Sequence, residues 1–172
     1  RRFMESTLNP DRQILEKMVS GAYLGPLCLE VIRTAAEEGL FPEKQAKALF
    51  ALDGLQSAGI SAFLTNSPYP LDLCVESTED VEILTDLLNA LISRAGKITA
   101  ANLAASILAT PYGEEMPILV NADGSTFYGT PGLKESTEQY LNEYLAPRGR
   151  SAVFARIEKS PTIGSAIGAL SI

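Results

Sequence analysis

The period of the hydrophobic pattern changes once along this chain, and this change limits the folds that the chain can adopt. Up to about residue 110, apolar side chains recur at spacings of three and four, as in amphipathic helices. Residues 118–120 then form a short continuous apolar run, which is typical of a buried strand. The remaining order is a β-hairpin, a helix at 133–145, a strand at 152–157 and a last helix. The 172 residues therefore predict one helix-rich α/β domain with a few strands, or one large piece of a bigger domain.

Local signals set the expected helix ends in the first half of the chain. Asn9 is a good N-cap and Pro10 a good first helical residue, so a helix is predicted to start there. The second helix is predicted to have its first turn near Pro26 and to end at Gly39, a typical C′ residue. A short helix is expected at residues 43–53. Residues 54–70 carry turn chemistry and are predicted to be irregular.

The second half has its own markers. Ser77 opens a long helical stretch in which Gly96 is a candidate for a break, and the following alanine-rich helix ends at Thr110. Asp123 and Gly124 are a strong hairpin signal, which predicts that residues 125–128 return as a strand. Residues 160–164 are predicted to be a loop before a helix at 164–170.

Composition excludes several classes of function. Histidine is absent, which removes Ser-His-Asp and Cys-His catalysis within the chain and the commonest zinc ligand. The net charge of −7 argues against wrapping nucleic acid or an anionic membrane surface. The richest apolar window, residues 87–92, is too short to span a bilayer, and no apolar core follows the two N-terminal arginines as in a signal peptide. Two cysteines favour a reducing, cytoplasmic setting.

Three polar side chains near the start of the chain could read a sugar. Asn9, Gln13 and Glu16 are spaced four and three apart, so on one helix face they would offer hydrogen-bond donors and acceptors together. The alternative is that Glu16 belongs to a solvated helix face with an i,i+4 ion pair. The residue four positions on is Ser20, however, which is not a cation. No cluster of metal ligands is present in the sequence.

Two turns could hold a phosphate or a nucleotide. Residues 123–125 combine a tight turn with a serine hydroxyl, which suits a phosphate, and the alternative is a plain hairpin turn. Residues 157–168 run from a strand through a Ser/Thr/Gly loop to a helix start, where free N–H groups attract anions. The alternative there is simple capping, since these residues spell neither a Walker A loop nor a dinucleotide fingerprint.

Together, four segments resemble the hexokinase family of eukaryotic type. The densest match is residues 9–25, NPDRQILEKMVSGAYLG, against a family segment that begins NPG and contains the EK and SG pairs. Residues 93–108, SRAGKITAANLAASIL, and 118–127, ILVNADGSTF, match two further segments. The ending SPTIGSAIGALSI, from residue 160, lies where the family has a glycine/alanine turn. The order and spacing of these matches cover nearly the whole chain.

The resemblance implies a fold and a set of roles. The expected fold is the helix-rich C-terminal part of the large domain of a hexokinase, an actin-like ATPase of ribonuclease H-like type, with residues 1–172 as a single fragment. Hexokinases phosphorylate the 6-hydroxyl of glucose with MgATP. Glu16 matches the glutamate that accepts hydrogen bonds from the sugar, and Gln13 supports it. The positions that match nucleotide contacts are Gly21, Thr65, Gly124, Ser125, Gly164 and Ala166.

The same resemblance implies what the fragment lacks. Family members carry a glycine-rich phosphate segment and a catalytic aspartate upstream, and no aspartate of this chain matches that motif. We therefore expect the fragment to be inactive alone and to need ATP, Mg²⁺, a hexose and the remaining N-terminal part of the enzyme, with a homo-oligomer as one further arrangement. The rewritten nucleotide segments, TNSPYP at 65–70 and SPTI at 160–163, leave an alternative: a non-catalytic sugar-binding or regulatory domain on the same fold.

Overall fold

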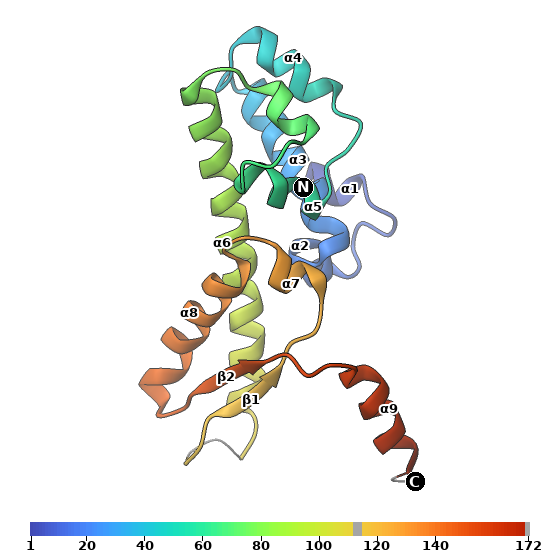
Figure 1. Cartoon of the computed structure of the whole chain (residues 1–172), viewed down its shortest axis with the longest axis vertical. Helices are drawn as coiled ribbons and strands as arrows, with labels where there is room; N and C mark the ends of the chain where they lie inside the picture. Colours follow the sequence, from blue (N-terminus) through green and yellow to red (C-terminus); the bar gives the residue numbers. More distant parts are fainter. Residues whose placement is uncertain (112–114, 171–172) are drawn as a thin grey trace.

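One long helix, α6 (Thr78–Leu108), runs along most of the molecule in this computed structural model, which describes residues 1–111 and 115–170 (Figure 1). Helices α3, α4 and α5 gather around its N-terminal half, and α8 and a small sheet lie along its C-terminal half, which α2 also contacts through Leu15 and Val19. The other elements are α1 (Arg2–Glu5), α2 (Ile14–Val19), α3 (Gly21–Glu37), α4 (Glu43–Ala51), α5 (Ser57–Leu64), the 3₁₀ helix η1 (Pro70–Cys74), β1 (Ile118–Asn121), α7 (Ser125–Gly129), α8 (Leu133–Leu145), the 3₁₀ helix η2 (Ala146–Arg148), β2 (Ala152–Ala155) and α9 (Ser160–Leu170).

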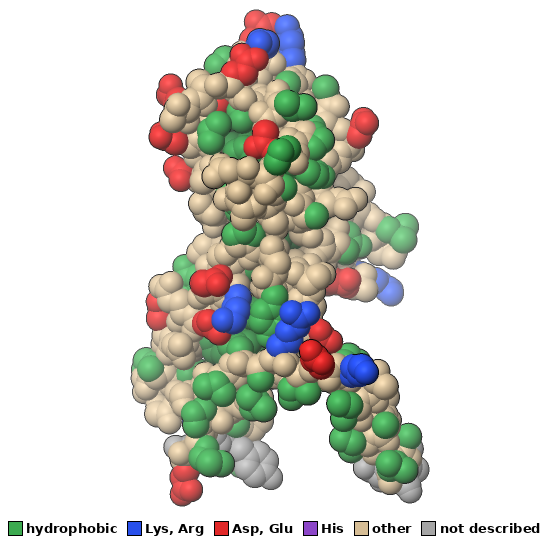
Figure 2. All heavy atoms as spheres, viewed as in Figure 1, with side chains coloured by type: hydrophobic (Ala, Val, Ile, Leu, Met, Phe, Trp, Pro, Cys, Tyr) green, Lys and Arg blue, Asp and Glu red, His purple; other side chains and the backbone are tan. Residues whose placement is uncertain are grey.

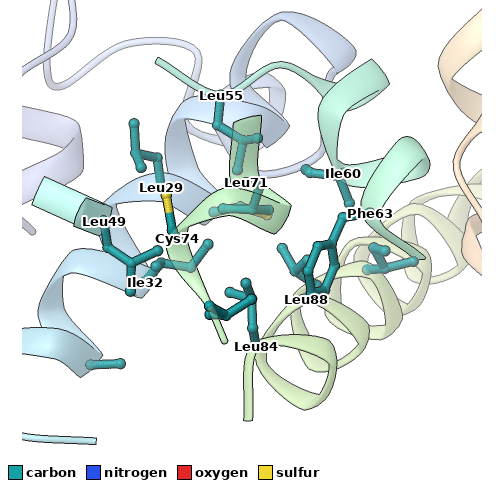
Figure 3. Close-up of a cluster of buried hydrophobic side chains, with 14 of the residues drawn as sticks. Leu29, Ile32, Leu49, Leu55, Ile60, Phe63, Leu71, Cys74, Leu84 and Leu88 are labelled. Carbon is teal, nitrogen blue, oxygen red and sulfur yellow. The ribbon is translucent and has the colours of Figure 1, made fainter. Parts of the chain in front are cut away.

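The main hydrophobic core joins α3, α4, α5 and η1 to the first half of α6 (Figure 3). The apolar stripe of each helix supplies it, as the spacing of three and four requires. Its fully buried members include Leu24, Cys28, Ile32, Leu49, Ile60, Leu71, Leu84 and Leu88.

A second, smaller core lies between the alanine-rich half of α6, α8 and the sheet. Small residues let the two helices approach closely: a Cβ at Gly96 would lie 2.7 Å from the Cβ of Ser136. The prediction of a break at Gly96 is therefore wrong, because the glycine serves this close contact and α6 continues through it. The helix predicted at 133–145 is confirmed as α8.

The sheet has two parallel strands among the described residues, not the predicted hairpin. β1 pairs with β2, with Ile118 opposite Ala152 and Asn121 opposite Ala155. Residues 125–129, expected to return as a strand, form helix α7 instead. The hairpin prediction is wrong because β1 finds its partner beyond α7 and α8, which connect the strands as a crossover.

Two predicted helix boundaries are confirmed by cap geometry. After α3, Gly39 has φ +82°, and the amides of Gly39 and Leu40 donate to the carbonyls of Ala36 and Ala35 at 3.2 and 3.0 Å. These paired bonds are the Schellman arrangement that favours glycine. At the other boundary, the Ser77 hydroxyl accepts the amide of Asp80 at 3.1 Å and caps α6.

The predicted starts of the first two helices are wrong. Asn9 lies in a turn with φ +56°, and α2 begins at Ile14 after Gln13, which has φ +54°. α3 begins at Gly21, so Pro26 lies inside it and not in its first turn. Leu24, which precedes Pro26, is buried in the core, and this tertiary packing outweighs the local preference of proline for the first turn of a helix.

Two segments predicted to be irregular are helical. α5 occupies residues 57–64, where buried Ile60 and Phe63 meet the main core. α9 begins at Ser160, four residues before its predicted start, and none of its residues is buried. Figure 1 shows α9 extending away from the end of β2. No described helix has the length and apolar character needed to cross a membrane.

Both cysteines should resist alkylation while the chain is folded. Burial raises the pKa of Cys28 to about 12 and also raises the pKa of Cys74, and the reactive species is the thiolate. At pH 8 we expect iodoacetamide to modify neither thiol on a timescale that labels both in urea, as read by mass spectrometry. The raised pKa of Cys28 contributes fully to the free energy of unfolding below about pH 9, the ordinary pKa of the thiol. This contribution declines as the pH rises from 9 towards 12. Rapid native labelling of Cys28 would contradict the buried site.

Candidate functional site

The carboxyl ends of both strands meet at one edge of the sheet, and this edge is the centre of the candidate site. β1 leads there into residues 123–125, and β2 leads into the segment before α9. In parallel sheets ligands bind outside the carboxyl ends of the strands, where loops converge. The phosphate candidate at 123–125 therefore lies at this edge of the sheet, although its turn is not a hairpin.

The loop at 123–125 has a conformation that favours glycine. Gly124 has φ +141°, and a Cβ there would meet no atom within 4 Å, so backbone conformation and not space selects the residue. The Tyr128 hydroxyl lies 3.3 Å from the carbonyl oxygen of Ala122 and 3.4 Å from that of Ala155. α7 is thereby tied to the ends of both strands, which holds the loop in place.

A pocket of about 310 Å³ lies between α5 and α7. The two helices are joined by a hydrogen bond in which the Ser61 hydroxyl donates to the Gly129 carbonyl at 2.9 Å. Hydroxyl groups are unusually frequent in its lining, and they can both donate to and accept from a polar ligand. The lining residues are Ser57, Ala58, Ser61, Ser125, Thr126, Gly129 and Thr130.

The junction between α2 and α3 lies directly against α7. A Cβ built on Gly21 would fall 2.0 Å from the Thr126 hydroxyl oxygen, so only glycine allows this approach without a shift. The structure thus brings Gly21 together with the 124–126 segment. Thr126 connects this junction to the pocket, because it also lines the pocket wall.

Glu16 and Gln13, the two candidates for sugar binding, belong to α2, the helix that precedes Gly21. Glu16 is on α2, about one turn before Gly21, and its side chain is exposed. Its backbone carbonyl accepts the amide of Ser20 at 2.8 Å. Gln13 is the exposed N-cap residue of α2. Asn9 does not share a helix face with them, because it lies in the preceding turn.

The remaining predicted nucleotide residues are less closely gathered. Thr65 is the exposed C-cap residue of α5, and its hydroxyl donates to the Ser61 carbonyl at 2.8 Å, so it lies one turn from the pocket wall. Gly164 and Ala166 are on the exposed helix α9, and the structure does not bring them together with Ser125.

Sequence reasoning missed four hydroxyl residues of the pocket: Ser57, Ser61, Thr126 and Thr130. The spacing of four between Ser57 and Ser61 would have indicated one face of a helix, but the segment was expected to be irregular. Within residues 1–111 and 115–170, no group of three or more acidic or cysteine side chains could hold a metal ion.

Comparison with known proteins fits this geometry. A model of the hexokinase family matches residues 1–171. The chain belongs to the hexokinase family. Hexokinase-1 of Spinacia oleracea is 29% identical over 182 aligned positions, which cover 96% of this chain and 36% of that protein. Hexokinase HKDC1 of Homo sapiens is 26% identical, over 84% of this chain and 17% of its own length.

A solved structure shares the fold. The hexokinase of Schistosoma mansoni, complexed with glucose, superposes with a TM-score of 0.70 at 21% identity, over 91% of this chain and 38% of the other. The predicted helix-rich α/β fold is thus confirmed as part of the hexokinase fold. The chain spans about a third of the length of the plant relatives that it matches, given the 36% coverage.

Proposed function

We propose that this chain forms one wall of the sugar site and part of the nucleotide site of an ATP-dependent hexokinase, which phosphorylates a glucose-type sugar at its 6-hydroxyl. Glu16 accepts hydrogen bonds from sugar hydroxyls, and Gln13 supports it from the N-cap of α2. The chain supplies binding and orientation, and the catalytic base comes from a part of the enzyme outside these residues.

The contact between Gly21 and Thr126 is the observation that carries this proposal. It sets the helix of Glu16, one turn upstream, beside the loop of Ser125 at the carboxyl edge of the sheet. Phosphoryl transfer requires a sugar hydroxyl and a phosphate donor to meet in line, so their binding elements must adjoin. The exposed Glu16 lies on the helix before Gly21, and Gly21 contacts Thr126 of the hydroxyl-lined pocket, an arrangement that supports this requirement.

The nucleotide would be ATP, held by residues that the fold brings together. Gly124 gives the loop its left-handed conformation, and Ser125 and Thr126 line the pocket beside it. Thr65, Gly164 and Ala166 remain candidates from the family resemblance. The described residues lack a carboxylate cluster for Mg²⁺, so no step is assigned to the metal on this chain.

Two surfaces favour the rest of a hexokinase chain as the partner. Leu119 and Val153 project from the two-stranded sheet at 58% and 49% exposure, and small parallel sheets are normally covered on both faces. Ile163 and Ile167 are exposed along α9. Figure 2 shows hydrophobic side chains at the surface of this helix and of the two-stranded sheet. A second copy of the chain is the other occupant to test, by sedimentation.

Replacing Glu16 tests the sugar role in the full-length enzyme. We expect Glu16→Ala to lower kcat/KM for glucose about 100-fold and Glu16→Gln about 10-fold, because charge-assisted hydrogen bonds are worth about 1.5–3 kcal/mol each. Coupled turnover assays and calorimetric glucose titrations supply the two readouts. Glu43→Gln, on an exposed carboxylate of α4, is the matched control and should leave both unchanged.

The outcomes separate the candidate functions. An unchanged kcat/KM in Glu16→Ala would refute the sugar role. Glucose binding without turnover in the full-length protein would favour the regulatory alternative, for which the separation of Gly164 and Ala166 from Ser125 is the supporting observation. The 172 residues alone should show no turnover, and appreciable turnover would contradict a base outside them.

A further inference from the structure

A charged side chain beside Glu16 is completely buried. Lys17 has 0% exposure and forms no ion pair in the described residues, whereas the side chains of the ion-paired Lys44, Lys47 and Lys134 are 76%, 73% and 36% exposed. Burying an ammonium group is costly unless its protons find acceptors, and an apolar side chain of similar volume would pack there at lower cost. The placement of Lys17 therefore calls for a reason other than packing.

The buried ammonium holds a backbone carbonyl of the preceding turn. Lys17 Nζ donates to the carbonyl oxygen of Asn9 at 2.6 Å, and no carboxylate among the described residues pairs with it. The same carbonyl accepts the amide of Arg12 at 3.0 Å. The Asn9 carbonyl thus accepts two hydrogen bonds, which hold the turn at residues 9–13 to helix α2.

This turn is strained and would not persist on local preferences alone. Asn9 and Gln13 have φ of +56° and +54°, a region that residues with side chains rarely adopt. Asn9 also precedes Pro10, whose ring further restricts its backbone. Strained turns persist where surrounding contacts hold them, and the bond from Lys17 is such a contact.

We propose that Lys17 is a positioning residue for the sugar site. By fixing Asn9 it sets the turn that ends at Gln13, whose carbonyl accepts the Lys17 amide at 3.0 Å and so begins α2. The orientation of Gln13 and Glu16 towards a sugar then depends on a side chain that never touches the sugar. This role rests on the proposed function, but the clamp on the turn can be measured without it.

The test uses Lys17→Met, which keeps the apolar stem and removes the donor, in the full-length enzyme. We expect amide hydrogen exchange at Arg12, whose amide bonds to the clamped Asn9 carbonyl, to accelerate about tenfold or more, since the turn loses its clamp. We expect KM for glucose to rise about tenfold while kcat changes less than about threefold, the pattern of lost ground-state positioning. Lys17→Arg keeps a donor and should restore part of both effects. Lys47→Met, on a side chain that is 73% exposed, is the control.

A measurement on the unmodified protein covers the case in which Lys17→Met does not fold. NMR of ¹⁵N-labelled lysine should show slow proton exchange at the Lys17 ammonium and fast exchange at Lys47. Equally fast exchange at both would overturn the clamp, as would unchanged exchange at the Arg12 amide in Lys17→Met. An accelerated turn with an unaltered glucose KM, in an enzyme whose Glu16→Ala variant is impaired, would overturn the positioning role alone. An enzyme that never binds glucose refutes the proposed function and leaves the exchange result to decide the clamp.

Discussion

Replacing Gly25 with alanine is expected to lower the free energy of unfolding by about 3 kcal/mol, the upper end for overpacking a core. A Cβ at this position would lie 2.2 Å from the carbonyl oxygen of Leu55 and 2.6 Å from the Cα of Gln56. Both are backbone atoms, which cannot rotate away as a flexible side chain would. α3 must therefore move off the 55–56 segment and lose contacts in the main core. The gain in helix propensity, about 1 kcal/mol, is too small to offset this.

Urea denaturation followed by circular dichroism measures the effect as a fall in the transition midpoint. Gly164→Ala is the matched control, because Gly164 is also helical but its Cβ would meet nothing within 4 Å. That variant should be as stable as the original chain or slightly more stable. Equal midpoints for Gly25→Ala and the original chain would show that α3 and the 55–56 segment are not packed as described.

Leu88→Ala should cost about 3 kcal/mol, within the range for deleting a fully buried leucine side chain. Leu88 lies on α6 with 0% exposure and packs within the cluster shown in Figure 3. Truncation would leave a cavity between α6 and the helices that surround its first half. For a chain of this size we expect Tm to fall by about 9 °C, at roughly 3 °C per kcal/mol.

Scanning calorimetry checks this value against Leu73→Ala. Leu73 is 83% exposed on η1, so its truncation should shift Tm by no more than about 1–2 °C, as is usual for surface substitutions. Similar losses for both variants would mean that burial does not distinguish the two sites. A larger loss for Leu73 would place η1 against a surface that the described residues do not include.

Helices with strong local signals could be predicted from the sequence. α8 was found from its amphipathic spacing, α6 from the Ser77 cap, and the end of α3 from Gly39. Each depends on residues within a few positions of one another, which is the range over which capping and periodicity act. α5 was not predicted because turn-forming residues surround it in the sequence. Its apolar face became evident only from the packing of Ile60 and Phe63 in the main core.

The hairpin failed for a different reason. Asp123 and Gly124 favour a tight turn locally, and residues 125–128 include β-formers. β1 nevertheless pairs with β2, and the residues between them form α7 and α8. Strand pairing is a choice among distant partners, so a local turn signal could not reveal it.

The sequence by itself determined the helix-rich α/β character, the main helices with their caps, and the hexokinase family through the motif that contains Gln13 and Glu16. Only the tertiary structure decided that the strands are parallel and that Gly21 meets Thr126. It alone also placed the Lys17 ammonium on Asn9. Caps and amphipathic stripes act within a few residues, whereas strand partners, close helix contacts and buried charges are settled when distant segments exclude water together.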